Sequence, residues 1–116
     1  MRVFKTKSFA RFARRANLRD EALCQAIAHA ELGLIDANLG GGVIKQRIAR
    51  LGQGKSGGFR VVVLYQRGVK AFFVYGFAKS AQANIARDEL AALKDLASEM
   101  LAYDDSKIDK QSRRAR

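Results

Sequence analysis

Several residue types are scarce or absent in this 116-residue sequence, and each absence narrows the possibilities. Proline and tryptophan are missing, while cysteine and histidine each occur once. Turns must therefore rely on Gly, Asn, Asp or Ser, and a lone cysteine cannot form an internal disulfide. We interpret Cys24 as a small buried hydrophobic residue and His29 as a surface or boundary residue. A single histidine gives no support for a metal site, and we expect neither a metal nor another cofactor.

Long hydrophobic runs are also missing. No run approaches the roughly 20 apolar residues that span a bilayer, and no apolar signal-peptide core follows the basic amino terminus. We therefore expect a cytoplasmic protein that does not enter a membrane. The hydrophobic content of 48% is typical of a globular chain, and this length corresponds to one domain. We expect that domain to occupy residues 1–103 and a basic, disordered tail to occupy residues 104–116.

Negative charge is absent from the middle of the chain. Every acidic residue lies either between Asp20 and Asp36 or between Asp88 and Asp109, whereas the net charge of the whole chain is +11. Nucleic acid, an anionic membrane and an acidic protein are the three partners that such a charge would attract. A basic stretch between more acidic segments favours a polyanion that lies on the middle part of the fold.

Hydrophobic periodicity predicts the order strand, helix, helix, three strands and helix. The predicted strands cover residues 2–5, 43–50, 59–66 and 71–78, and the predicted helices begin near Thr6, Asp20 and Ala81, the last ending near Tyr103. This order is typical of an α+β domain with a small, mainly antiparallel sheet. We expect the helices to cover one face of the sheet and to leave the other face partly open.

Two glycine-rich segments separate the predicted elements. Residues 40–42 are three consecutive glycines, which we interpret as a flexible connector. Residues 51–58 read as the connection of a β-hairpin, with Lys55 at its tip. Within the sheet, the alternation of strand side chains predicts that Phe73, Tyr75 and Phe77 lie on one face.

Four basic residues are the candidates for a catalytic site. Lys45 and Arg47 share one face of their strand because strand side chains alternate. Arg60 and Lys79 can come close to them, since adjacent strands lie about 5 Å apart. Clustered cations favour an anion such as phosphate, which arginine binds through two parallel hydrogen bonds. Crowding among cations also lowers the pKa of a lysine and lets it act as a base.

Such a site could cleave RNA without a metal ion. A base would remove the proton of a ribose 2′-hydroxyl, that oxygen would attack the adjacent phosphorus, and arginines would stabilise the charge on the phosphoryl oxygens. A two-metal nuclease needs several carboxylates, which the acid-free stretch does not supply. Arg50 and Lys55 are further candidates for contacts with RNA. From the residues alone, binding of nucleic acid or of an acidic protein without catalysis stays an open alternative.

At these residues the sequence resembles the RelE/ParE superfamily of bacterial toxin–antitoxin toxins, on its RelE/HigB side. The resemblance extends from Phe4 to Met100. Three short matches carry it, and their order agrees with the order of the predicted elements: Lys45 with Arg47, then Gly58-Phe59-Arg60, then Gly76-Phe77-Ala78-Lys79. Asn84-Ile85 and Asp88-Glu89 look like the usual continuation in this family.

The resemblance implies a RelE-like fold and an mRNA interferase that acts on ribosome-bound message. It also implies a cognate antitoxin, often a helix-turn-helix repressor in HigB-like systems. By position, Arg60 would stabilise the phosphate, Lys45 and Arg47 would supply the base and further positive charge, and Lys79 would contact substrate or take part in catalysis. The general acid has no assigned residue, because the histidines that some relatives use are absent. A gyrase-targeting toxin of the ParE kind and a non-catalytic RNA-binding module stay open.

Overall fold

The computed structural model describes residues 1–50, 54–78, 85–102 and 112–114 of the chain. The elements, in chain order, are β1 (Arg2–Thr6), α1 (Lys7–Ala16), α2 (Asp20–Glu31), β2 (Ala37–Gly40), β3 (Val43–Arg50), β4 (Gly54–Gln66), β5 (Lys70–Ala78), α3 (Arg87–Met100) and β6 (Ser112–Arg114). The predicted order is confirmed, with β2 and β6 as additions. Because β6 falls in residues 104–116, three residues of the expected tail form a strand. Residues 104–111 and 115–116 of the expected tail lie outside the described residues.

The strands form one sheet in the order β2-β3-β4-β5-β1-β6. Strands β1 and β5 are parallel, and the other neighbouring pairs are antiparallel. The predicted α+β class with a mainly antiparallel sheet is therefore confirmed. The long central strand β4 carries apolar side chains on both faces, from Val61 to Leu64, and all four are fully buried, as expected for a strand that is covered on both sides.

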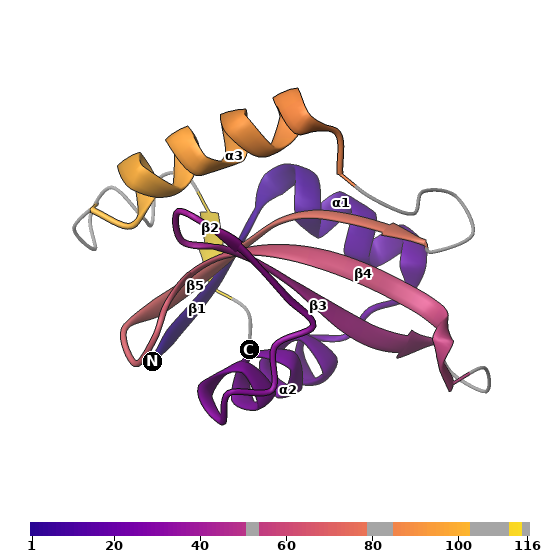
Figure 1. Cartoon of the computed structure of the whole chain (residues 1–116). Helices are drawn as coiled ribbons and strands as arrows, with labels where there is room; N and C mark the ends of the chain where they lie inside the picture. Colours follow the sequence, from indigo (N-terminus) through magenta and orange to yellow (C-terminus); the bar gives the residue numbers. More distant parts are fainter. Residues whose placement is uncertain (51–53, 79–84, 103–111, 115–116) are drawn as a thin grey trace.

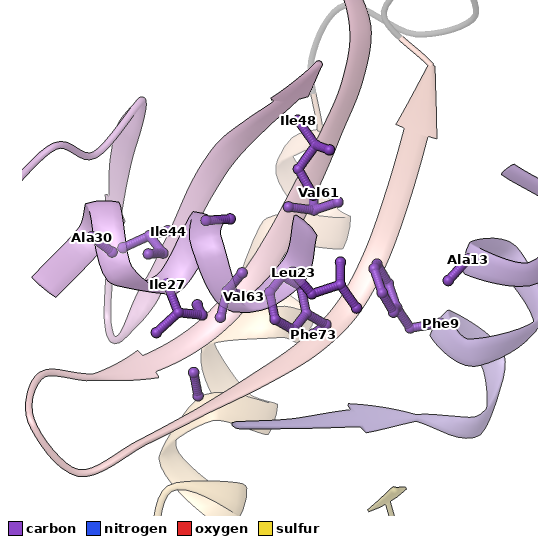
Figure 2. Close-up of a cluster of buried hydrophobic side chains, with 12 residues drawn as sticks. Phe9, Ala13, Leu23, Ile27, Ala30, Ile44, Ile48, Val61, Val63 and Phe73 are labelled. Atoms are coloured by element: carbon purple, nitrogen blue, oxygen red, sulfur yellow. The ribbon is translucent and has the colours of Figure 1, made fainter. Parts of the chain in front are cut away.

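Helices cover both faces of the sheet, which corrects the expectation of helices on one face only. One core contains Phe9 of α1, Leu23 and Ile27 of α2, and Val61 and Val63 of β4. Figure 2 shows these side chains meeting between the two helices and the sheet. The core on the other face contains Val62 and Leu64 of β4 together with Ala97 and Met100 of α3. Figure 1 accordingly shows α3 and α2 on opposite sides of the sheet.

Local sequence signals explain the ends of α1. The side-chain oxygen of Thr6 accepts a hydrogen bond of 3.2 Å from the Phe9 backbone N–H, so Thr6 is the N-cap. At the other end, Asn17 adopts the left-handed conformation with a φ of 59°, a conformation that asparagine tolerates better than most residues. The predicted starts of the first two helices, near Thr6 and Asp20, are both confirmed.

The three glycines at 40–42 form a hairpin turn between β2 and β3 rather than a flexible connector. All three have positive φ values, from 61° to 86°, which only glycine adopts at little cost. A Cβ on Gly41 would lie 3.0 Å from Cγ of Lys94, so the turn also packs closely against α3. The short strand β2 was not predicted, because its four residues, ANLG, show no hydrophobic alternation.

A bulge in β5 changes the face to which its later side chains point. Val62 pairs with Tyr75 and Val63 pairs with Phe73, so one extra residue of β5 is inserted between these pairs. Phe73 consequently lies in the core beneath α1 and α2, whereas Tyr75 and Phe77 lie on the α3 side. The prediction that Phe73, Tyr75 and Phe77 share one face was therefore wrong.

Two boundaries also differ from the predictions. Strand β4 begins at Gly54 rather than at Phe59, which places Lys55 inside a strand and not at the tip of a loop. Helix α3 begins at Arg87, and Ile85 and Ala86 precede it in extended or irregular backbone. The Glu89 carboxylate accepts a hydrogen bond of 3.2 Å from the Ala86 backbone N–H, which satisfies one of the free donors at this helix end.

Candidate nucleic-acid interface

Arg47 and Arg60 lie directly opposite each other on neighbouring strands. Arg47 of β3 pairs with Arg60 of β4, and Lys45 pairs with Val62 two residues further along the same strands. Val62 belongs to the core beneath α3, and side chains two residues apart share a face. Lys45, Arg47 and Arg60 therefore lie on one face of the sheet, as the sequence predicted, but this face also carries α3, whereas the predicted face was free of helices.

Arg60 is buried, in contrast to the open surface that we expected. Its residue exposure is only 5%, and its Nη1 atom is fully buried without a hydrogen-bond partner in the described part of the chain. A buried guanidinium nitrogen that has lost its water normally finds an acceptor, because an unmade hydrogen bond to a charged group is costly. The free Nη1 is therefore a donor that an anionic ligand could satisfy.

Arg47 is held in place by Asp36. The Arg47 Nε donates a hydrogen bond of 2.7 Å to Oδ1 of Asp36, while about half of the Arg47 side chain stays exposed. Because this contact uses Nε, the terminal nitrogens of Arg47 are not occupied by the same bond. Sequence reasoning missed Asp36, although it is the last acidic residue before the acid-free stretch.

A buried glutamine fixes the backbone that carries Asp36. The side-chain amide of Gln46 donates hydrogen bonds of 3.0 Å to the Ala26 carbonyl and 3.1 Å to the Leu34 carbonyl. Its carbonyl oxygen accepts a bond of 2.8 Å from the Asp36 backbone N–H. With only 3% exposure, Gln46 is buried and has partners for both ends of its amide. This network ties α2, the segment before β2, and Arg47 into one unit.

The other predicted site residues differ in how far the structure places them. Lys45 is half-buried and lies between Ala37 of β2 and Val62 of β4. Lys79 lies outside the described residues. Arg50 and Lys55 lie in β3 and β4 respectively, but their side chains are outside the described part of the structure. The structure therefore brings together Lys45, Arg47 and Arg60 among the six predicted basic residues.

Aromatic side chains border the cationic group on β5. Phe77 pairs with Arg60 across the strands, and Tyr75 pairs with Val62. The two rings contact each other with centroids 5.8 Å apart. Both rings pack in the α3-side core. Their position beside Arg60 was hidden by the bulge, which no sequence pattern indicated.

Helix α3 covers the same face at a different place. Its amino-terminal half, with Glu89 and Leu93, lines a groove of about 290 Å³ together with Val74 of β5 and Ser8 of α1. Its carboxyl-terminal end packs against the β2–β3 hairpin, where a Cβ on Gly42 would lie 3.0 Å from Leu101. Neither the groove nor this contact with the hairpin involves Arg47 or Arg60.

A second polar cluster lies at the opposite end of β4 and stabilises the fold. The Tyr65 hydroxyl and the Gly68 backbone N–H both donate hydrogen bonds to the Glu31 carboxylate. The bond from Tyr65, followed by that from Gly68, lowers the pKa of Glu31. Burial, with a contribution from Glu31, raises the pKa of Tyr65 to about 12. This cluster joins the end of α2 to the β4–β5 turn.

Two kinds of feature are missing from the described residues. No group of three or more His, Cys, Asp or Glu side chains in the described ranges is placed to hold a metal ion. No described helix is both long and apolar enough to cross a membrane.

The fold and the cluster of basic residues agree with the family to which the sequence belongs. Residues 1–115 match the family described as the RelE toxin of the RelE / RelB toxin–antitoxin system. The chain is therefore a member of the RelE toxin family, and an antitoxin is its expected partner as the toxin of such a system. A comparison with curated proteins finds no significant match.

Proposed function

We propose that this toxin is an endoribonuclease that cleaves mRNA by attack of a ribose 2′-hydroxyl on the neighbouring phosphorus. The new bond gives a 2′,3′-cyclic phosphate, and the bond from phosphorus to the 5′ oxygen of the next nucleotide breaks, so that this oxygen takes up a proton and leaves as a hydroxyl. The single observation that carries the proposal is the buried Nη1 of Arg60, which has no hydrogen-bond partner among the described residues and lies beside two further cations. Two arginines directly opposite each other repel, and an anion between them removes that penalty. A phosphodiester has the charge and the acceptor oxygens that two guanidinium groups bind well.

Each residue has a distinct role in this proposal. Arg60 donates from its buried Nη1 to a phosphoryl oxygen, where a preorganised donor stabilises the charge of the transition state. Arg47, held at Nε by Asp36, presents its terminal nitrogens to the same phosphate or to the next one. Lys45 is the candidate base for the 2′-hydroxyl proton, and Lys79 is a further candidate for substrate contact or catalysis. Arg50 and Lys55 extend the same strands and are candidates for contacts with flanking phosphates.

The family and this chemistry also support a proposal for the partners. We propose that the message is cleaved on the ribosome, which stops translation in the cytoplasm, without a metal ion. The antitoxin would be of the helix-turn-helix type found with HigB-like toxins. Only RNA carries the 2′-hydroxyl, so DNA would not be cleaved.

Induction of the toxin followed by primer extension on cellular messages tests the proposal. We expect new 5′ ends within messages for the wild type and none for Arg60→Ala, with growth arrest lost in parallel. Arg87→Ala is the matched control, because Arg87 is an exposed arginine on α3 that no described contact ties to the site. It should cleave like the wild type.

The same experiment separates the alternatives. If Arg60→Ala is folded, as judged by circular dichroism, and remains toxic, the proposed role of Arg60 is wrong. If the wild type arrests growth with messages intact and with gyrase-dependent DNA breaks, the toxin is of the ParE kind. Binding of RNA without new 5′ ends would identify a non-catalytic RNA-binding module.

A further inference from the structure

Helix α1 differs in charge from the other two helices. Its ten residues include four basic side chains and no acidic one. Helix α2 has three acidic residues and no lysine or arginine, and α3 has four acidic residues against two basic ones. The positive charge of the helical layer is therefore concentrated on α1.

The four basic residues of α1 lie on one side of the helix. At 100° per residue, Lys7, Arg11, Arg14 and Arg15 fall within an arc of about 100°. All four are exposed, whereas Phe9, Ala10 and Ala13 point the opposite way into the core. Within the described part of the chain, none of the four forms an ion pair. We call these four residues the α1 basic stripe.

The α1 basic stripe is rigidly attached near the end of the sheet that carries Arg60. The Phe12 ring meets the Phe59 ring edge-on with centroids 5.9 Å apart, and Phe59 is the residue before Arg60. The same ring covers Gly76, where an added Cβ would lie only 2.3 Å from it. The Thr6 cap fixes the other end of the helix. Such preorganisation lowers the entropy that binding must pay.

The stripe and Arg60 lie on opposite sides of the sheet. Helix α1 packs in the core that contains Val61 and Phe73, whereas Arg60 lies on the α3 side. The outer surface of a packed helix lies roughly 15 Å from the plane of its sheet, given a layer spacing of about 10 Å and a helix radius of about 5 Å. One short strand of RNA bound at Arg60 cannot fill both places. A folded RNA that extends past the edge of the sheet can.

We propose that the α1 basic stripe is a second RNA-binding surface, which contacts the phosphate backbone of folded RNA next to the single strand that is cleaved. This inference depends on the proposed ribonuclease function. The stripe runs over nine residues, from Lys7 to Arg15, which is about 12 Å along the helix axis. A double-stranded nucleic acid presents many phosphates over that length. Contacts of this kind position the partner and carry no sequence preference.

An anionic membrane is the less favoured partner. A helix that binds a membrane surface inserts an apolar face beneath the lipid headgroups. The apolar face of α1 is already buried against the sheet, since Phe9, Ala10 and Ala13 are each at most 5% exposed. Only charge would remain for lipid binding.

Fluorescence anisotropy with two 2′-O-methyl RNA probes tests the inference, because these probes lack the attacking hydroxyl. One probe is a single-stranded hexanucleotide, and the other is the same hexanucleotide joined to a stable hairpin. The test variant is Arg11→Gln/Arg14→Gln. The control variant is Arg67→Gln/Arg87→Gln, which removes the same charge from exposed positions outside α1. Glutamine keeps a helix propensity close to that of arginine.

For the test variant we expect an affinity for the hairpin probe that is at least about 10-fold weaker than that of the wild type at low salt. The slope of log K against log salt should fall by about 1.5, as expected for two lost phosphate contacts. Affinity for the hexanucleotide should stay within about two-fold, and the control should keep most of its affinity for both probes. Equal losses in the test and control variants would overturn the inference, because net charge alone would then be responsible.

Two further arms separate the ways in which the idea can fail. If the test variant loses binding to vesicles of phosphatidylcholine and phosphatidylserine but keeps its affinity for the hairpin, the stripe is a membrane surface and the inference is wrong. If the substitutions in the α1 basic stripe leave the affinity for the hairpin probe unchanged while Arg60→Ala abolishes cleavage, only this inference fails. If the wild type binds neither RNA probe and cleaves no message, the proposed function fails with it.

Discussion

Arg47 and Arg60 face each other across the β3–β4 ladder, and only the first has a described acidic partner. Asp36 offsets part of the charge of Arg47, whereas the Nη1 of Arg60 is buried without an acceptor among the described residues. Like charges directly opposite in a sheet destabilise it. The free protein therefore keeps an arrangement that costs folding free energy, as expected for a site that is complementary to an anion.

Arg60→Met should separate stability from function. Methionine retains much of the length of the side chain and removes the buried charge, and such replacements of buried ionic groups often stabilise proteins by about 1–4 kcal/mol. We expect the urea midpoint to rise and message cleavage to disappear. Arg60→Ala should also abolish cleavage but gain less stability, because it leaves a cavity. A loss of several kcal/mol in Arg60→Met would show that Arg60 is a satisfied structural residue.

Asp36→Asn should lower cleavage with little effect on stability. The ion pair with Arg47 is partly exposed, and such pairs contribute at most about 1 kcal/mol. Loss of the carboxylate frees Arg47 to adopt other orientations, so the cleavage rate with bound substrate should fall. Asp20→Asn is the matched control, because it breaks a pair of the same 2.7 Å length, with Lys5, at the base of α2.

Single-turnover kinetics on defined ribosome complexes, with urea unfolding in parallel, measures both quantities. The two variants should lose similar amounts of stability, and only Asp36→Asn should be slow. Equal cleavage rates for the two variants would show that Asp36 does not position Arg47 for cleavage.

The Glu31 cluster predicts how stability depends on pH. Because hydrogen bonds from Tyr65 and Gly68 lower the pKa of Glu31 below its ordinary 4.5, the folded state holds fewer protons than the unfolded state in this range. The contribution is present above about pH 4.5 and is lost as the pH falls through the folded pKa. Glu31→Gln should therefore be less stable than the wild type at pH 7, and the gap should close toward pH 3.

At alkaline pH the stability changes with pH in the opposite direction, because stability is lost as the pH rises. The pKa of Tyr65 is raised to about 12, so its contribution is present below about pH 10 and is lost as the pH rises toward 12. Tyr65→Phe should remove this loss. Urea midpoints measured from pH 3 to pH 11 for the wild type and both variants provide the check, and parallel curves at all pH values would contradict it.

The contact of Phe12 with Gly76 should be intolerant of added volume. Alanine at position 76 would place its Cβ 2.3 Å from Cε2 of the Phe12 ring, and φ at this position is not the obstacle. We expect Gly76→Ala to cost about 1–3 kcal/mol in unfolding free energy, as overpacking typically does. Adding Phe12→Leu should recover part of that loss. A double-mutant cycle by urea unfolding measures the coupling, and additive effects would argue against the contact.

The sequence predicted the order of the elements because each element carries a local signal. The Thr6 cap, the acidic start of α2 at Asp20 and the apolar run of β4 are examples. The placement of Lys45 and Arg47 on the same face of β3 also followed from strand alternation alone. These features depend only on neighbouring residues, so a single sequence is enough to indicate them.

Features that depend on tertiary packing were not predictable in this way. The hydrophobic periodicity of α3 indicates that one side of this helix packs against the sheet, but not which face of the sheet it covers. The bulge beside Val62 shifts the side chains of β5 without any glycine or proline at the inserted position to mark it. The burial of Arg60 likewise results from its neighbours in space, because its strand position alone suggested an open face.

Cleavage of a message that carries a single 2′-deoxy nucleotide tests the central claim most directly. The substitution is placed at the cleaved position of a ribosome-bound message, after primer extension has mapped that position with the all-ribose message. The account predicts that the deoxy message binds normally and is not cleaved at that position, while the all-ribose message is cleaved to a 2′,3′-cyclic phosphate. Equal cleavage of both messages would contradict attack by the 2′-hydroxyl.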